Sequence, residues 1–318
     1  MKIDVPLLKL PRTYCAKTLA TEVAALPLSA WLTHPGRLVG NDAVPLISPA
    51  GAITNAFKGP MASTEHLRHC PYILEIMADL GAVWGRSRLM GLAPGAVVPK
   101  HVDVGHYWRT HLRIHIPVVT SRQVEFTCAG ETVNMAAGEC WIFDSFRTHD
   151  VRNGGTEKRV HLVLDTVGGD ELWGLMDLAL REGRSAAPQF VSPGCATTSP
   201  LRFEQYNTPE IMSVWEARCH VAFLMEQIPE GPGRDAVQSV LDRFLHRWGA
   251  LWAEFGDHPD GLPDYARVIV DTRDHIQRAG ANRIALPNKI ALDRALNELI
   301  FMAAAPDVPS LLTVKLFE

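Results

Sequence analysis

The chain has 318 residues, 47% of them hydrophobic, which is enough to bury one large core and a smaller one. Its net charge of −4 gives no electrostatic support for binding nucleic acid or an anionic membrane surface. The first residues are interrupted by charges and prolines, and no apolar run of about 18 residues occurs, so neither a signal peptide nor a membrane span is predicted. The six cysteines show no CxxC spacing, and we expect a cytoplasmic protein with reduced thiols.

Periodicity and turn residues divide the chain near residue 200. Before this point, one helix is predicted over residues 64–83, and residues 86–167 are rich in strand patterns. A short helix is predicted over residues 171–182. A segment rich in Ser, Thr, Pro and Gly then predicts a linker at residues 186–200.

After the linker, apolar residues recur at spacings of three and four, which is typical of amphipathic helices. The clearest pattern covers residues 237–255, and residues 209–228 and 289–304 are similar. We interpret the apolar and aromatic stripe as a packing surface between helices. The predicted organisation is a core domain at residues 1–199 with an N-terminal helical layer, followed by a helical domain at residues 200–318.

Two histidines and one aspartate in the strand-rich region have the spacing of a metal site. His101 and Asp103 are two residues apart, so on a strand both side chains project to the same face. His149 follows after 45 residues, enough for several strands to return to the first. Two imidazoles and one carboxylate suit non-haem Fe(II) and its activation of O₂. A second His-x-Asp sequence, at His258 and Asp260, lies among Gly and Pro and is interpreted as a loop.

Arg159 follows the last of these ligands by ten residues, across a sequence that predicts a hairpin. The turn signal is Asn-Gly-Gly at residues 153–155. A hairpin with this turn would set His149 opposite Arg159. The guanidinium would then stand beside the metal, where it can hold a carboxylate in a bidentate fork. The alternative is that Arg159 is a solvated charge at the end of a strand.

The same region resembles the aspartyl/asparaginyl β-hydroxylase family of Fe(II)- and 2-oxoglutarate-dependent dioxygenases, and it is also similar to bacterial proline hydroxylases. The matching sequences are PG at 94–95, HVD at 101–103, RIHIPV at 113–118, GECWIFD at 138–144, THDV at 148–151 and RVHLVLD at 159–165. The resemblance implies an α+β fold with a double-stranded β-helix core, a jelly roll of the cupin-like type, with flanking helices. The helical domain would follow this core.

Carried over by position, the resemblance implies a catalytic iron centre with three protein ligands, which are His101, Asp103 and His149. It implies that Arg159 binds the distal carboxylate of 2-oxoglutarate. In the family, an Arg-x-His pair on the strand after the first metal ligands contacts the other end of this cosubstrate. Arg113 and His115 match that pair.

Other positions in this region leave alternatives. If residues 107–115 form one strand, Arg109 and His111 share a face with the matching Arg-x-His pair and could replace it. The peptidyl β-hydroxylases place a serine eleven residues before the first metal histidine, where this chain has Met90. We interpret His161 as a hydrogen-bonded sheet residue and His106 as a loop residue.

The function that the resemblance implies is hydroxylation of an amino-acid carbon with Fe(II), 2-oxoglutarate and O₂. β-Hydroxylation of an Asp- or Asn-type residue in a peptide or protein is the first hypothesis, and hydroxylation of a free amino acid such as L-proline is the alternative. A cupin-type metal-binding isomerase or a non-catalytic binding protein is a hypothesis of another class. The expected partner is an amino acid or peptide, not nucleic acid or a membrane, and no oligomeric state is predicted.

Overall fold

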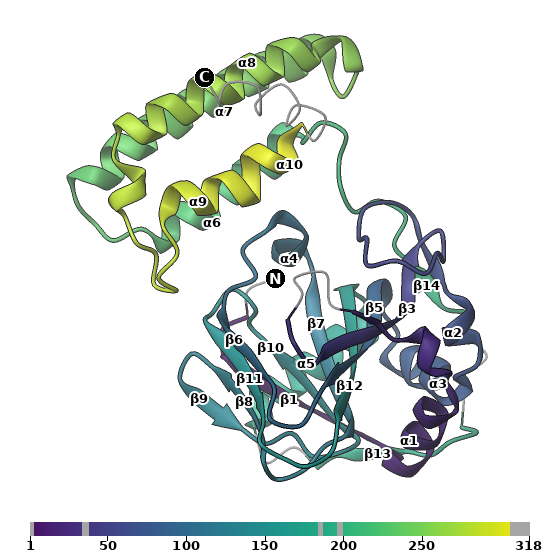
Figure 1. Cartoon of the computed structure of the whole chain (residues 1–318). Coiled ribbons are helices and arrows are strands. Elements are labelled where there is room, and N and C mark those ends of the chain that lie inside the picture. Colours follow the sequence, from purple (N-terminus) through teal and green to yellow (C-terminus); the bar gives the residue numbers. More distant parts are fainter. Residues whose placement is uncertain (1–2, 34–37, 184–186, 196–199, 306–318) are drawn as a thin grey trace. The chain divides into compact units, whose positions relative to one another are not determined.

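The computed structural model describes residues 3–33, 38–183, 187–195 and 200–305 (Figure 1). The chain forms two compact units. The first comprises residues 1–103 and 110–207, and the second, the helical unit, comprises residues 104–109 and 208–318. The predicted division after Ser199 lies outside the described residues, and so does part of the predicted linker; the units divide after Asn207.

The first unit is a mixed α+β structure with two sheets, most of whose strands are antiparallel. Hydrogen-bonded neighbours in the larger sheet follow the order β13 (Gln189–Val191), β1 (Leu7–Tyr14), β10 (Glu139–Phe143), β7 (Leu112–Val119), β12 (Arg159–Gly168), β5 (Val83–Leu92), β3 (Asn41–Pro49), β2 (Leu32–Thr33). At its edges, β4 (Met61–Ser63) pairs with β3 and β14 (Arg202–Phe203) pairs with β5. The smaller sheet has the order β6 (Val97–His101), β11 (His149–Asn153), β8 (Val124–Cys128), β9 (Glu131–Val133).

Alternation along the strands separates two apolar layers of this unit. On β10, Cys140 and Ile142 belong to the main core, whereas Trp141 and Phe143 belong to a smaller cluster with Phe126 of β8. Successive strand residues point to opposite faces, so one face of the larger sheet meets helices and the other meets the smaller sheet. Cys140 is completely buried in the main core.

Four helices accompany the larger sheet, and they are α1 (Ala16–Ala25), α2 (Glu65–Arg68), α3 (Pro71–Leu80) and α5 (Asp170–Glu182). Figure 1 shows α1, α2 and α3 gathered beside one another. The single helix predicted over residues 64–83 is in fact two. Cys70 has φ −122° and ψ 70°, because Pro71 disfavours helical backbone in the residue before it. The helix predicted at residues 171–182 corresponds to α5.

Two local predictions in the strand-rich region are wrong. Residues 107–115 are not one strand, because α4 (His106–Thr110) precedes β7, and Arg109 therefore lies on a helix. The hairpin at residues 153–155 is wrong too, because β11 and β12 belong to different sheets. The Asn153 side chain donates to the carbonyls of Leu92 (2.9 Å) and Glu157 (2.8 Å), which holds the chain as it crosses between the sheets.

The helical unit contains, besides α4, the helices α6 (Val214–Gln227), α7 (Pro232–Phe255), α8 (Leu262–Arg278), α9 (Leu292–Leu296) and α10 (Met302–Ala304). Trp248 of α7 packs on Tyr265 of α8, with ring centroids 4.4 Å apart, and the stripe at Val237, Leu241 and Phe244 is buried. The packing role predicted for this stripe is confirmed. Within the described ranges, no helix has the length and apolar character needed to cross a membrane.

Candidate active site

The three predicted iron ligands lie together at the ends of two paired strands. His101 is the last residue of β6 and His149 the first of β11, and the register sets them directly opposite each other. Their ring centroids are 4.1 Å apart, and Oδ1 of Asp103 lies 3.9 Å from Nε2 of His101. The ligand atoms of all three lie within 4.8 Å of one another, so a single ion can contact each of them after small side-chain adjustments.

Backbone carbonyls fix the tautomers of both histidines. Nδ1 of His101 donates to the carbonyl of Pro99, and Nδ1 of His149 donates to the carbonyl of Arg147, each at 2.8 Å. A carbonyl only accepts, so in the neutral ring the proton is on Nδ1 and the Nε2 lone pair faces the metal position. Burial lowers the pKa of His149 to about 4, which keeps this imidazole neutral at pH 7 and ready to bind a metal.

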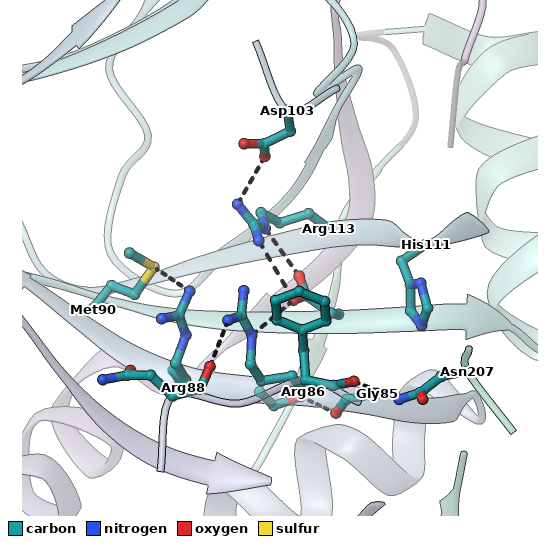
Figure 2. A network of polar contacts seen from close by, with 12 residues as sticks. Gly85, Arg86, Arg88, Met90, Asp103, His111, Arg113 and Asn207 are labelled. Atoms are coloured by element: carbon teal, nitrogen blue, oxygen red, sulfur yellow. Dashed lines mark hydrogen bonds and ion pairs between the residues drawn. The ribbon is translucent and has the colours of Figure 1, made fainter. Parts of the chain in front are cut away.

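Asp103 is held by an ion-pair network that begins in the larger sheet. Nη1 of Arg113 donates to Oδ2 of Asp103 (3.1 Å), while its Nε and Nη2 donate to Asp165 (2.9 and 3.4 Å), as Figure 2 shows for Arg113 and Asp103. Burial raises the pKa of Asp165, but Arg113 and Arg86 lower it more, so the pKa lies below its usual value. Arg113 thus occupies one oxygen of Asp103 and leaves Oδ1 on the side of His101.

Arg113→Gln is expected to weaken Fe(II) binding by ~10–100-fold, because a group that orients a ligating carboxylate contributes that much to metal affinity. Asp165→Asn should reproduce part of this loss, since Asp165 holds the guanidinium. Fe(II) titration of the purified proteins measures both effects. The family resemblance also predicts a contact of Arg113 with 2-oxoglutarate. If Arg113→Gln binds Fe(II) as tightly as wild type but binds 2-oxoglutarate more weakly, Arg113 contacts the cosubstrate and does not orient Asp103.

Beside the triad, the face of β12 that is directed toward the smaller sheet carries polar groups. Arg159, His161 and Asp165 alternate on this face, whereas Val160, Leu162 and Leu164 belong to the core on the opposite face. His115 of β7 lies against them, with Nδ1 3.4 Å from Nδ1 of His161. Burial, with Arg159 next in importance, lowers the pKa of both imidazoles well below the usual value.

This polar group adjoins the metal position through one aromatic side chain. The ring of Phe143 lies 4.8 Å from that of His149 and 5.3 Å from that of His115. Nε and Nη2 of Arg159, Nε2 of His115 and Nε2 of His161 are buried and have no hydrogen-bond partner among the described residues. Buried polar groups are normally paired, so these four atoms have hydrogen-bonding capacity left for a polar ligand or for water.

Arg159 is therefore not the solvated strand end that was the alternative. Its exposed fraction is 5%, and burial lowers its pKa to about 9, which still leaves the guanidinium charged at neutral pH. It is positioned by β12 of the larger sheet and not by a hairpin with β11.

Two further residues lie near Arg159. His161 is a hydrogen-bonded sheet residue, as predicted, with His115 as its partner, and it shares a face of β12 with Arg159. Thr120 follows β7; its Oγ1 is buried without a partner among the described residues, and it lines a small pocket together with Arg159. No motif pointed to Thr120.

The alternative Arg-x-His pair is not assembled in the pocket. Nε2 of His111 pairs with Oε1 of Glu204 at 2.8 Å. Arg109 belongs to the helical unit, where its guanidinium lies 4.1 Å from the ring centroid of Phe223. His258, the histidine of the second His-x-Asp sequence, lies in a loop with 65% of its side chain exposed, as predicted.

Residues 56–168 match the family described as Aspartyl/Asparaginyl beta-hydroxylase. This part of the chain includes the triad, the Arg113–Asp165 pair and Arg159. The match confirms the resemblance drawn from the motifs. The chain is thus an enzyme, a dioxygenase, and the part that carries the site is similar to the hydroxylase family named above.

Solved structures similar to this chain include an oxidoreductase of the 2OG-Fe(II) oxygenase family from Burkholderia pseudomallei (15% identity, covering 53% of this chain and 88% of that one, TM-score 0.40). A prolyl-4-hydroxylase from Pseudomonas putida is similar at 14% identity, over 51% and 92% of the two chains, with a TM-score of 0.35. The Cnp3 cupin domain of Schizosaccharomyces pombe is similar at 16% identity, over 31% and 61%, with a TM-score of 0.22. No curated protein matches the chain significantly.

Proposed function

We propose that this chain is an Fe(II)- and 2-oxoglutarate-dependent hydroxylase, with iron held by His101, Asp103 and His149 in a double-stranded β-helix formed by the two sheets. The observation that carries the proposal is Arg159, a buried cation with two N–H groups that have no partner among the described residues. A buried charge is costly unless a counter-charge pairs with it. A carboxylate of a small dicarboxylic acid would provide that pairing.

We infer that the polar groups around Arg159 would hold both ends of such a molecule. Arg159 would hold the distal carboxylate, and Thr120 would complete its binding in place of the serine that the peptidyl enzymes have at the position of Met90. His115 and His161 would add one hydrogen-bond donor. In the pair of neutral rings, Nδ1–H of one donates to Nδ1 of the other, so the accepting ring carries its own proton on Nε2 and can donate it to the ligand. We propose that His115 and Arg113 lie near the end of the cosubstrate that approaches the metal, as the family resemblance predicts.

His101, Asp103 and His149 would hold iron through three ligands, which would leave room at the ion for the cosubstrate and O₂. Bound iron and 2-oxoglutarate supply C–H hydroxylation, in which one atom of O₂ enters the new hydroxyl group, the other enters succinate, and CO₂ is released. The chain's residues would bind and orient the reactants. Asp103, fixed by Arg113, and the two histidines, fixed by backbone carbonyls, present their donor atoms in a set geometry before the metal arrives.

The substrate class we propose is an amino-acid carbon, with an Asp- or Asn-type residue in a peptide or protein first and a free amino acid such as L-proline second. The family supports the first choice. Neither a cupin-type isomerase nor a non-catalytic binding protein requires a buried arginine near the metal position. These two hypotheses therefore come after the hydroxylase.

The test is substrate-dependent release of succinate by the purified full chain with Fe(II), O₂ and 2-oxoglutarate. Peptides that contain Asp or Asn and a panel of free amino acids are compared, and products are examined for a mass gain of one oxygen atom. Hydroxylated product with matching succinate supports the proposal. Stable Fe(II) binding with no succinate under any of these conditions, and no binding of 2-oxoglutarate, would return the cupin hypothesis to first place.

Thr120→Val is expected to weaken 2-oxoglutarate binding on the order of 10-fold, because one hydrogen bond to a carboxylate is lost while the side-chain volume is kept. Thr127→Val is the matched control. Its hydroxyl pairs with Thr132 at 3.0 Å on β9, and its neighbours Phe126 and Cys128 occupy the buried face. Anaerobic titration of the Fe(II) protein gives both dissociation constants. Equal constants for Thr120→Val and wild type would exclude this role of Thr120.

A further inference from the structure

The helical unit contains a second group of two histidines and one carboxylate. His106 is the first residue of α4, and Glu216 and His220 lie one turn apart on α6. Nε2 of His106 lies 2.6 Å from Oε1 of Glu216, and Nε2 of His220 lies 3.5 Å from the same oxygen. The three ligand atoms lie within 4.8 Å of one another. All three residues belong to one compact unit.

His220 distinguishes this group from an ordinary buried ion pair. Its exposed fraction is 4%, and neither of its ring nitrogens has a hydrogen-bond partner of normal geometry among the described residues. A histidine that only fills space in a helix packing would be expected to satisfy at least one nitrogen. Here Nε2 is directed to the carboxylate that His106 also contacts, and the rings of the two histidines are 5.2 Å apart in an edge-to-face arrangement.

We propose that His106, Glu216 and His220 form a second metal site, which binds a divalent transition-metal ion of the Zn(II) type. Two imidazoles and one carboxylate are a donor set that zinc accepts, with water in the fourth position. Residues four apart on a helix lie on one face, so α6 presents two of the ligands without any change of backbone. The third ligand, His106, comes from α4, so a bound ion would link α4 to α6.

A zinc ion fits among the three ligand atoms after a small movement of the side chains. In a tetrahedral site with bonds of 2.0–2.1 Å, ligand atoms are separated by ~3.3 Å. The His220–Glu216 pair is already near that separation, whereas the His106–Glu216 pair must move apart by ~0.7 Å to admit a zinc ion of these bond lengths. The side chain of Glu216 is 28% exposed and can rotate to do so.

Binding would join residues 104–109 to α6. This segment begins directly after Asp103 in the sequence, and it is a part of the helical unit although it lies between two strands of the other unit along the chain. The ion would therefore tie the residues that directly follow Asp103 in the sequence to α6. The inference does not depend on the proposed hydroxylation.

The test separates the two sites by removing the first. In the full chain carrying His101→Ala and His149→Ala, we expect one equivalent of Co(II) to bind with the visible absorption of a four-coordinate site, and Zn(II) to displace it. Adding Glu216→Gln should weaken this binding by at least ~100-fold, beyond the range for residues that merely orient a ligand. Adding His246→Ala, at an exposed histidine of α7, should leave it unchanged.

Two outcomes would overturn the inference. One is a protein without the first-site histidines that binds no Co(II) or Zn(II) above the level of its Glu216→Gln derivative. The other is binding that persists when Glu216→Gln and His220→Asn are combined. Either result would make the group an ion pair only. Far-UV circular dichroism checks that each variant is folded. If a His220 variant does not fold, the comparison with Glu216→Gln, at a partly exposed position, tests the inference by itself.

Discussion

Replacing His101 by alanine is expected to abolish substrate-dependent succinate formation and to weaken Fe(II) binding by more than ~100-fold. The loss should exceed the ~10–100-fold effect of groups that only orient a ligand, because one of three direct ligands is removed. The side chain of His101 is 41% exposed, so the fold should be unaffected. His149→Ala should have the same effect on iron, but it removes a buried ring and needs a check of thermal stability.

His258→Ala is the matched control for this experiment. The residue has the same spacing to an aspartate, yet it lies in an exposed loop, and its removal should change neither iron binding nor turnover. Fe(II) titration and succinate release under saturating 2-oxoglutarate measure both properties. Normal turnover by His101→Ala would show that the iron centre lies elsewhere in the chain.

The parts of the site that the sequence predicted are those set by local rules. The two-residue spacing of His101 and Asp103 and the apolar pattern before them predicted a shared site on a strand. The two residues do lie together, but β6 ends at His101 and Asp103 follows outside the strand, so strand alternation does not place Asp103. The spacing to His149 allowed for a return to the same place, and β6 and β11 do pair there. The amphipathic period after residue 208 likewise predicted helices α6 and α7, because a helical stripe is a property of a single segment.

The parts that the sequence could not give depend on contacts between distant segments. The Asn-Gly-Gly sequence is compatible both with a hairpin and with a crossing between two sheets. In the structure, Asn153 donates to the carbonyl of Leu92, more than sixty positions earlier, and this contact accompanies the crossing. The partner of His106 is 110 residues away on α6. The break between α2 and α3, by contrast, had a local cause in Pro71 that the single predicted helix ignored.

The role of Arg113 shows why a resemblance and a geometry can assign different tasks to one residue. A motif carries over the identity of a side chain and its strand, but not its partners. Here Asp165, directly opposite on β12, and Asp103 both accept from the same guanidinium. The fixed charge beside the ligating carboxylate is a property of the three residues together, and only the folded chain reveals it.

Arg159→Gln is expected to weaken 2-oxoglutarate binding by one to two powers of ten, with Fe(II) affinity near that of wild type. Charge-assisted hydrogen bonds to a carboxylate are worth about 1.5–3 kcal/mol, which corresponds to this range. Arg159→Lys should give an intermediate value, since an ammonium group keeps the charge but not the planar fork. Anaerobic titration of 2-oxoglutarate into the Fe(II) proteins, followed by the metal-to-ligand absorbance, measures each constant.

A second measurement tests whether Arg159 awaits a ligand or serves the fold. Its two buried N–H groups have no partner among the described residues, so removing the charge should not lower the melting temperature of the protein without 2-oxoglutarate. Wild type should instead be stabilised by added 2-oxoglutarate, and Arg159→Gln much less, because only the native state binds the ligand. A variant that melts well below wild type without ligand, yet binds 2-oxoglutarate as tightly once folded, would make Arg159 a structural residue. That result would remove the main support for the proposed cosubstrate pocket.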